Sequence, residues 1–177
     1  MEQFRGTTIV AVKKDGKTVI AGDGQVTMGQ QVIFKGKAHK VRRLFDGKVV
    51  VGFAGGTADA FAMCEEFEKM LNKYSGSLMR SGVEFAKSIR SAGRNNGEAL
   101  MIVADKSTLL ILTSAGDVIE PDDGVCAIGS GGNYALSAAK ALIKNTNLDA
   151  REIALKAMEI ATEICVFTNG NYVVEEV

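Results

Sequence analysis

Residues 4–24 read FRGTTIVAVKKDGKTVIAGDG, and this stretch decides how the chain folds. The β-branched, apolar run at 7–12 predicts a buried strand, and 18–21 predicts the strand that returns beside it. Between them, Asp15-Gly16 is typical of a tight hairpin turn, because glycine readily adopts the positive φ that such a turn requires. The hairpin would bring Asp23 back to the beginning of the first strand.

The junction Gly6-Thr7 at the head of this strand suggests a reactive threonine. If the bond between the two residues is cut, Thr7 gains a free α-amino group whose pKa lies near ~8. Such an amine can take the proton from the hydroxyl of its own residue, so one residue supplies both nucleophile and base. The alternative is that Thr7 is an ordinary strand residue behind a polar N-terminal tail.

The composition narrows the class of protein. A length of 177 residues suits one domain with a sizeable core. Equal numbers of basic and acidic residues, 21 of each, argue against a general nucleic-acid binder or an anionic-membrane binder. There is no apolar run long enough for a transmembrane span and no secretory signal in residues 1–6, so no membrane partner is expected. Three widely spaced cysteines (Cys64, Cys126 and Cys165) favour reduced thiols in a cytoplasmic protein over disulfides or a zinc site.

The rest of the chain alternates between groups of strands and pairs of helices. Further strands are predicted at 48–54, 99–104, 108–113, 118–120, 125–128 and 172–174. One helix is expected to begin after Thr57 as N-cap, with an apolar stripe formed by Ala60, Phe61, Cys64, Phe67, Met70 and Leu71. A second is expected from the capping box Ser81–Glu84 until a break at 92–97, with Val83, Ala86 and Ile89 facing inward. A third is predicted near 134–144, and a fourth from the capping box Asp149–Glu152, with Ile153, Ala157, Ile160, Ala161 and Ile164 inward. This order predicts antiparallel sheets packed on each other, with helix pairs on both outer faces.

Several familiar catalytic sites are excluded. A Ser-His-Asp or Cys-His site requires a histidine, and the only one, His39, stands in the basic run 35–43 and is expected at the surface. No G-K-[ST] motif is present, so no nucleotide site is expected on this chain. The glycine-rich loop 129–134 is compatible either with a strand-to-helix turn capped by Ser130 or with a catalytic role for Ser130.

Six motifs occur in order between Thr7 and the C-terminus. They are TTIV at 7–10, AGDGQ at 21–25, KVRRL at 40–44, GFAGGTADA at 52–60, AIGSGG at 127–132 and ICVFTN at 164–169. Together they resemble the HslV family (also called ClpQ), the proteasome-related peptidase subunits of bacterial HslUV proteases. The resemblance implies an α+β, four-layer αββα sandwich, the N-terminal nucleophile hydrolase fold, with residues 1–6 as propeptide and 7–177 as a single domain. It also implies two stacked hexameric rings and allosteric activation by the AAA+ ATPase HslU, which delivers unfolded polypeptides.

The resemblance also assigns the site residues. Thr7 matches the nucleophile, Lys40 the active-site lysine, Asp23 the acid that pairs with this lysine, and Ser130 the serine near the threonine amine. Gly55 is the expected backbone N–H donor to the oxyanion. Three positions match residues whose backbone carbonyls hold a sodium ion in the family, namely Thr162, Cys165 and Thr168; a plain helix C-terminus would look the same in sequence.

The chain departs from the family pattern at three places. Six residues precede Thr7, so autocatalytic cleavage after Gly6 is required. One extra residue lies between Gly29 and Lys40, and segment 90–98 is shorter and less basic than usual. The rival interpretations are a catalytically silent ring subunit, which would keep residues 1–6, and a small-amide hydrolase that needs no ATPase.

Overall fold

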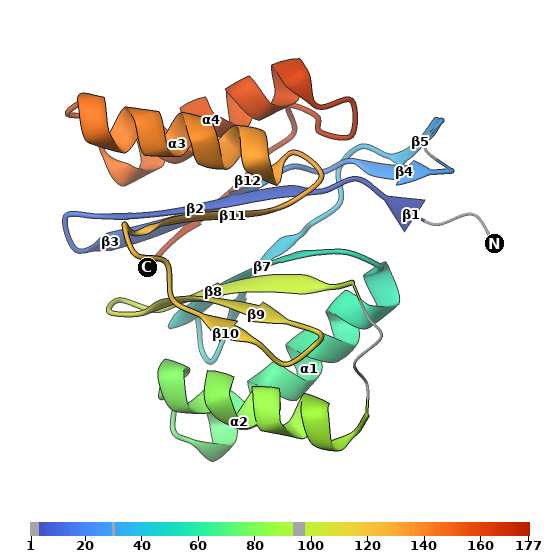
Figure 1. Ribbon diagram of the computed structural model, residues 1–177, viewed down its shortest axis with the longest axis vertical. Helices are drawn as coiled ribbons and strands as arrows, with labels where there is room; N and C mark the ends of the chain where they lie inside the picture. Colours follow the sequence, from blue (N-terminus) through green and yellow to red (C-terminus); the bar gives the residue numbers. More distant parts are fainter. Residues whose placement is uncertain (1–3, 30, 94–97) are drawn as a thin grey trace.

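The structure, a computed structural model, describes residues 4–29, 31–93 and 98–177. It has four layers (Figure 1). Helices α3 (Gly132–Asn145) and α4 (Ala150–Ile164) cover one antiparallel sheet, and helices α1 (Thr57–Lys73) and α2 (Leu78–Ser91) cover a second. The two sheets pack face to face between the helix pairs. The αββα sandwich predicted from the order of elements is therefore confirmed.

The first sheet is built around the predicted hairpin. Its strand order is β11 (Val125–Gly129), β2 (Thr8–Lys14), β3 (Lys17–Gly22) and β12 (Val173–Glu176). Asp15 and Gly16 have φ values of 52° and 78°, as a two-residue turn with two positive φ angles requires. Successive side chains of β2 alternate between two cores: Val10 and Val12 pack toward α3 and α4, whereas Ile9 and Ala11 pack toward the other sheet.

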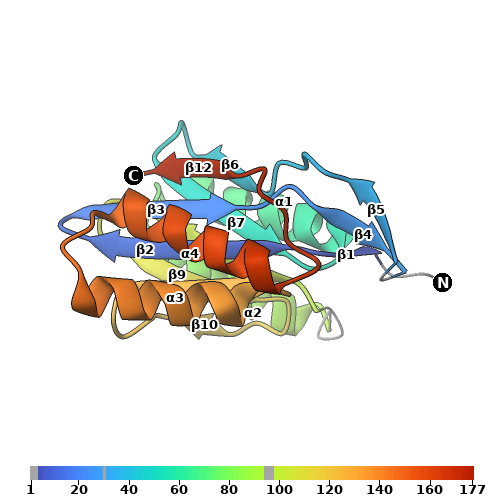
Figure 2. The ribbon, with the colours of Figure 1, turned by 90° about the horizontal axis from the view of Figure 1, so that it is seen from above.

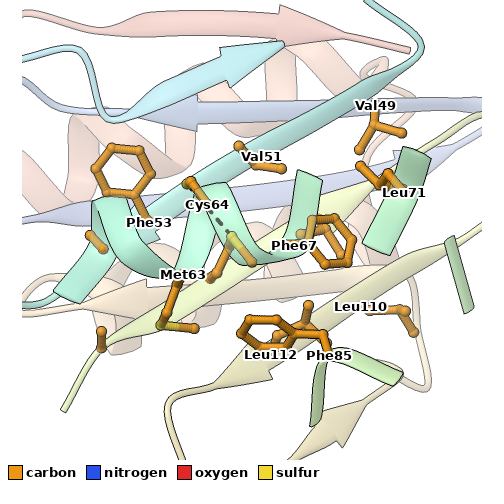
Figure 3. Close-up of a cluster of buried hydrophobic side chains, with 14 of the residues drawn as sticks. Val49, Val51, Phe53, Met63, Cys64, Phe67, Leu71, Phe85, Leu110 and Leu112 are labelled. Carbon is orange, nitrogen blue, oxygen red and sulfur yellow. Dashed lines mark hydrogen bonds between the residues drawn. The ribbon is translucent and has the colours of Figure 1, made fainter. Parts of the chain in front are cut away.

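The second sheet and its helices enclose a third apolar cluster. The strand order is β10 (Val118–Ile119), β9 (Leu109–Thr113), β8 (Leu100–Ala104), β7 (Val49–Ala54) and β6 (Val41–Leu44). Figure 3 shows the side chains that fill the space between this sheet and helices α1 and α2. Phe67 and Phe85 meet edge to face there, with ring centroids 6.0 Å apart, and join the two helices.

A small third sheet extends from the end of the sandwich where β2 begins (Figures 1 and 2). It contains β1 (Phe4–Arg5), β4 (Val26–Met28) and β5 (Val32–Lys35), in that order. β1 lies within residues 1–6, the segment before Thr7 (the leader), and it pairs antiparallel with β4, so Phe4 and Arg5 are part of the small sheet. β5 exposes its apolar residues, with Phe34 65% exposed.

Several local predictions were wrong in detail. Gly56, not Thr57, is the N-cap of α1, and α2 begins at Leu78 after Ser77, so Ser81 is a buried residue inside α2. Gly131 is the N-cap of α3, which rules out Ser130 as the cap. The capping box of α4 is confirmed in both of its hydrogen bonds. Residues 94–97 of the predicted break lie outside the described residues.

Four residues expected in apolar stripes are exposed instead, namely Phe61, Val83, Ile160 and Ile164. α2 approaches β9 through Gly82, where an added Cβ would lie 3.3 Å from Leu110, and this contact turns Val83 outward. α4 packs through small residues such as Ala157 and Ala161, which leaves its larger isoleucines at 160 and 164 outside the contact.

The three cysteines are separate buried thiols. Burial raises the pKa of the Cys64 thiol to about 11 and that of Cys126 to about 12. No helix within the described ranges combines the length and apolar character needed to cross a membrane.

Candidate active site

Thr7 lies at the start of β2, directly after the last leader residue. Its side chain is buried, and its hydroxyl donates a hydrogen bond of 2.6 Å to the carbonyl oxygen of Gly6. Gly6 has φ +111°, and a Cβ added to it would lie 2.9 Å from Thr27 Oγ1. Only glycine fits this conformation without strain, so the residue before Thr7 is fixed by both backbone and packing.

Asp23 reaches the same place from the end of β3, as the hairpin predicted. It is fully buried, and Thr8 N donates to its Oδ1 at 2.8 Å. Its Oδ2 accepts from the backbone N–H groups of Gln25 and Asn169, at 3.0 and 3.2 Å. A buried carboxylate is costly unless its oxygens are hydrogen-bonded, and these contacts satisfy that requirement.

Lys40 comes to this point from the segment before β6 and is 5% exposed. Its Nζ donates to Asp23 Oδ1 at 3.0 Å, to Gly6 O at 2.8 Å and to Gln25 O at 2.5 Å. An ammonium group has three N–H donors, so all three are used. Gly6 O therefore accepts from both the Lys40 ammonium and the Thr7 hydroxyl.

Burial lowers the pKa of the Lys40 amine below its ordinary value of 10.5, because removal from water disfavours the charged form. The Asp23 carboxylate opposes this effect through its charge and its hydrogen bond. The Lys40 amine is therefore easier to deprotonate than that of a surface lysine.

A cavity of about 560 Å³ opens beside these groups. Thr7, Gly6 and Lys40 form one wall of it, and the rest is mostly aromatic or basic, formed by Val26, Phe34, Lys35, Ala38, His39, Arg42, Phe53, Gly55 and Phe61. The Arg42 guanidinium lies over the Phe61 ring, 4.5 Å from its centroid. The prediction that His39 is exposed is confirmed, and Phe61, expected in the core, lines this cavity instead.

Gly55 lies in the cavity wall with Thr7 and Lys40. It has φ +116°, and an added Cβ would lie 2.7 Å from Ala99 Cα, so this position also requires glycine. Its N–H makes no hydrogen bond with any described residue. A free backbone N–H in the wall of the cavity has the chemistry that an oxyanion donor needs.

Ser130 lies next to Thr7 through the pairing of β11 with β2. Gly129 is opposite Thr8 in this ladder, so Ser130 is one step further, at the level of Thr7. The backbone segments at Gly129 and Thr7 are in close contact, since a Cβ on Gly129 would lie 2.1 Å from Thr7 O. The Ser130 side chain is exposed and makes no hydrogen bond with any described residue.

Thr162, Cys165 and Thr168 lie together at the C-terminal end of α4. Thr162 is in the last turn of the helix, Cys165 is its C-cap, and Thr168 N donates to Cys165 O at 3.0 Å. Within the described residues, no group of three or more His, Cys, Asp or Glu side chains could hold a metal ion.

Sequence reasoning missed a second polar group behind the site. Thr8 Oγ1 lies 2.7 Å from Thr168 Oγ1 and accepts from Gly131 N at 3.0 Å. Gln25 donates from Nε2 to Val166 O at 2.9 Å. The doubled threonine at 7–8 and the ICVFTN motif at 164–169 were the only signals for these contacts.

The comparisons with known proteins agree with this geometry. The family model described as "Proteasome subunit" matches residues 3–177. The ATP-dependent protease subunit HslV of Treponema denticola is 54% identical over 177 residues, which cover 99% of each chain. The protein of the same name from a Sulfurihydrogenibium species is 57% identical over 178 residues, covering 100% of this chain and 99% of that protein. This chain belongs to the HslV family of proteasome subunits.

Solved structures extend the likeness to the fold. The crystal structure of eukaryotic HslV from Trypanosoma brucei matches with a TM-score of 0.89 and 44% identity, covering 96% of this chain and 98% of that one. Thiobacillus denitrificans BPH in complex with epoxomicin matches with a TM-score of 0.72 at 19% identity, covering 96% of this chain and 97% of that one, and it supports the fold alone. The chain is thus a threonine peptidase of the N-terminal nucleophile type, from a family of ATP-dependent protease subunits.

Proposed function

We propose that this chain removes its own residues 1–6 and then acts, through Thr7, as the proteolytic core of an ATP-dependent protease. Residues 7–177 would form the mature peptidase domain. The observation that carries the proposal is the position of the Gly6 carbonyl, whose oxygen accepts from Thr7 Oγ1 at 2.6 Å and from Lys40 Nζ at 2.8 Å. The hydroxyl and the cation that would activate the bond thus meet at the bond to be cut.

Removal of the leader would proceed by acyl transfer from nitrogen to oxygen. Thr7 Oγ1 adds to the Gly6 carbonyl carbon, and the Lys40 ammonium stabilises the negative charge on Gly6 O. The Gly6–Thr7 C–N bond then breaks, the Thr7 nitrogen receives the proton that the Thr7 hydroxyl lost on attack, and an ester joins Gly6 to the Thr7 side chain. Water hydrolyses this ester and releases residues 1–6 with a free carboxylate.

The mature site would use the same groups with a different base. The new Thr7 α-amino group takes the hydroxyl proton as the oxygen attacks a substrate carbonyl, and it returns the proton to the leaving amine. Water then hydrolyses the ester that joins the substrate to Thr7 and restores the free hydroxyl. Lys40, held by Asp23, favours the unprotonated amine through its charge, and loss of Gly6 O frees one of its donors. Gly55 N–H would hold the oxyanion, and Ser130, level with Thr7, would orient the amine.

Departure of the leader would also open a binding edge. β4 pairs with β1 on one side and with β5 on the other, so removal of β1 would leave one edge of β4, whose Val26 lines the cavity, without a partner strand. An extended peptide can add to such an edge through main-chain hydrogen bonds, which suits unfolded polypeptide substrates of varied sequence.

The assembly is proposed from the family. Relatives that share 54% and 57% of the sequence over nearly the whole chain carry the name ATP-dependent protease subunit. We expect two stacked hexameric rings that enclose the sites, with allosteric activation by the HslU ATPase, which would bind the nucleotide. Enclosure of the sites within rings is consistent with a residue that is both nucleophile and base, because an unenclosed site of this kind would cut other proteins in the cell. The free, buried thiols favour the cytoplasm.

The end of α4 is suited to a structural sodium ion. The last carbonyls of a helix carry partial negative charge, and carbonyl oxygens are ligands for hard cations. Thr162, Cys165 and Thr168 would supply them, with Cys165 O using the lone pair left by its bond from Thr168 N. Thermal stability should then rise with sodium chloride more than with choline chloride at equal ionic strength.

Intact mass and a peptidase assay, with and without a cognate HslU ATPase, test the proposal. We expect loss of residues 1–6 and peptide cleavage that increases when the ATPase and ATP are present. Retention of the leader would favour a catalytically silent ring subunit. Full activity on small amides without any ATPase would favour the small-amide hydrolase.

A further inference from the structure

The turn that follows α4, residues 165–171, lies at the end of the molecule that carries the small sheet (Figures 1 and 2). Its half-buried residue Asn169 contacts the segment that carries Asp23 with both its backbone and its side chain. The side chain of Asn169 takes no part in the chemistry described above.

The contacts of Asn169 reach three separate segments. Its backbone N–H donates to Asp23 Oδ2 at 3.2 Å. Its Oδ1 accepts from Gly24 N at 3.3 Å and from Asn171 N at 3.1 Å, and its Nδ2 donates to Gly36 O at 2.9 Å. One side chain therefore joins the residue after Asp23 to the loop that precedes Lys40.

These two segments are also in direct contact, so a small shift of one affects the other. Ala38 N donates to Gly24 O at 2.9 Å, and a Cβ on Gly24 would lie 2.7 Å from Gly36 O. Asp23 immediately precedes the first of these segments and Lys40 follows the second, and Asp23 Oδ1 lies 3.0 Å from Lys40 Nζ.

We propose that Asn169 is a positioning residue for the Asp23–Lys40 pair, an inference that rests on the catalytic roles proposed for these two residues. Asp23 Oδ2 has two backbone donors, and Asn169 supplies one of them. With the Asn169 side chain removed, the turn loses its bond to Gly24 N and one of its two bonds to Gly36 O, so the backbone that presents the Asn169 N–H to Asp23 Oδ2 is held less firmly. Displacement of a catalytic group by ~1 Å can lower a rate by ~10²-fold.

Asn171 provides a matched control. Its Nδ2 also donates to Gly36 O at 2.9 Å, but among the described residues its side chain makes no hydrogen bond with Asp23 or Gly24. Asn169→Ala should lower kcat by about 10-fold and slow removal of residues 1–6 to a similar degree, with KM within about 2-fold. Asn171→Ala should change all three quantities by less than about 2-fold. Each kcat is divided by the amount of processed chain, measured by intact mass, so that a folding defect does not enter it.

Two further readouts separate positioning from a general structural effect. Asn169→Asp keeps an oxygen that can accept from Gly24 N and Asn171 N, so it should recover part of the kcat lost in Asn169→Ala. The fall of kcat at alkaline pH should begin at lower pH in Asn169→Ala, because a displaced Asp23 opposes the burial of Lys40 less. The other charged groups at the cavity (Lys35, His39 and Arg42) are the same in every variant.

Equal kcat values for Asn169→Ala and Asn171→Ala, with Asp23→Asn inactive, would overturn this inference and leave the proposed function standing. Full activity in Asp23→Asn would contradict the proposed function itself. If Asn169→Ala does not fold, Asn169→Ser and Asn171→Ser give the same comparison, and equal kcat values there would overturn the inference in the same way.

Discussion

Two lysine–carboxylate pairs of similar geometry lie in very different regions of the molecule. Lys40 Nζ is 3.0 Å from Asp23 Oδ1, and these side chains are 6% and 0% exposed. Lys87 Nζ is 2.8 Å from Glu84 Oε1 on the outer face of α2, where the side chains are 66% and 30% exposed. Judged by the N–O distance alone, the surface pair would be the stronger ion pair. Burial is what separates the two.

The difference in burial between the two pairs indicates that the buried pair has a role other than stabilising the fold. A buried ion pair is costly to desolvate and is often no more stabilising than apolar residues of the same size. The chain nevertheless surrounds Asp23 with backbone donors from Thr8, Gln25 and Asn169 and places Lys40 against the Gly6 carbonyl. We interpret the buried pair as part of the chemistry at Thr7 and the surface pair as a minor contribution to helix stability.

The largest expected effect comes from removing the group that the buried pair serves. Thr7→Ala leaves Lys40 and Asp23 in place but should lower peptide cleavage by ~10³-fold or more, because no other residue supplies the nucleophile. Intact mass should show residues 1–6 still attached, and gel filtration should show unchanged assembly. Full activity in this variant would mean that the buried pair serves another residue.

Breaking the buried pair should affect both stability and activity. Lys40→Met leaves Asp23 without its cation and should lower the free energy of unfolding by about 3–5 kcal/mol, measured by chemical denaturation. Leader removal and peptide cleavage should also fall by about 10²-fold, as when one group that stabilises an oxyanion is lost. The double variant Lys40→Met, Asp23→Asn removes both charges, so it should regain stability and stay inactive. Recovery of activity in the double variant would contradict the chemical role.

Changing the residue before the cut bond tests the precursor geometry. Gly6→Val puts a β-branched residue at φ +111° and a Cβ against Thr27 Oγ1. Strain of this kind costs about 1–3 kcal/mol, so leader removal should slow by roughly 10-fold or more. A chain that starts Met-Thr7, matured by removal of methionine, should have normal peptidase activity. A normal rate of leader removal in Gly6→Val, followed by mass spectrometry, would mean that the leader cleaves from another conformation.

The pH dependence should have opposite signs for activity and stability. In the proposed mechanism the charged form of Lys40 is the active one, so the rate should fall as pH rises through its lowered pKa, by ~10-fold per pH unit above it. Between that pKa and 10.5, the unfolded chain binds more protons than the folded one, so the contribution of Lys40 to the free energy of unfolding rises with pH. Rate profiles between pH 7 and 10.5 test the fall in rate, and denaturation curves over the same range test the rise in the free energy of unfolding. Lys40→Met, which lacks the lysine, is the control for both.

The smallest effect is expected at the surface pair. Lys87→Met should change the free energy of unfolding by no more than about 0.5 kcal/mol, because an exposed pair at this helical spacing is weak and screened by salt. Peptide cleavage should be unchanged. If Lys87→Met lowered the free energy of unfolding as much as Lys40→Met does, burial would not be what distinguishes the two ion pairs.

The sequence predicted the fold well because its signals were local. Asp15-Gly16 identified the hairpin, the β-branched, apolar run at 7–12 predicted a buried strand, and the hairpin placed Asp23 near Thr7. The position of Lys40 could not be predicted from its own segment, since a basic run normally lies in solvent. Its burial depends on carbonyls of Gly6 and Gln25, and only the resemblance to the family indicated its role.

Helix faces and polar contacts across the chain were harder to predict. Val83 fits the apolar spacing of α2, yet the close approach at Gly82 turns it outward. β1 was not foreseen, because two residues of a polar tail carry no strand pattern and pair only once β4 is formed. Asn169 lies more than 100 residues from Asp23, Gly24 and Gly36, and no local pattern predicts contacts over such a distance.

The burial of the three cysteines has a consequence for covalent labelling. Thiolates, not thiols, react with electrophiles, and burial raises the pKa values of Cys64 and Cys126 to about 11 and about 12. All three sulfurs lie in the interior of the folded chain, whereas Thr7 lines an open cavity. An electrophilic inhibitor added to the native mature protein should therefore attach at Thr7 without prior blocking of thiols, and its stoichiometry would count competent subunits directly.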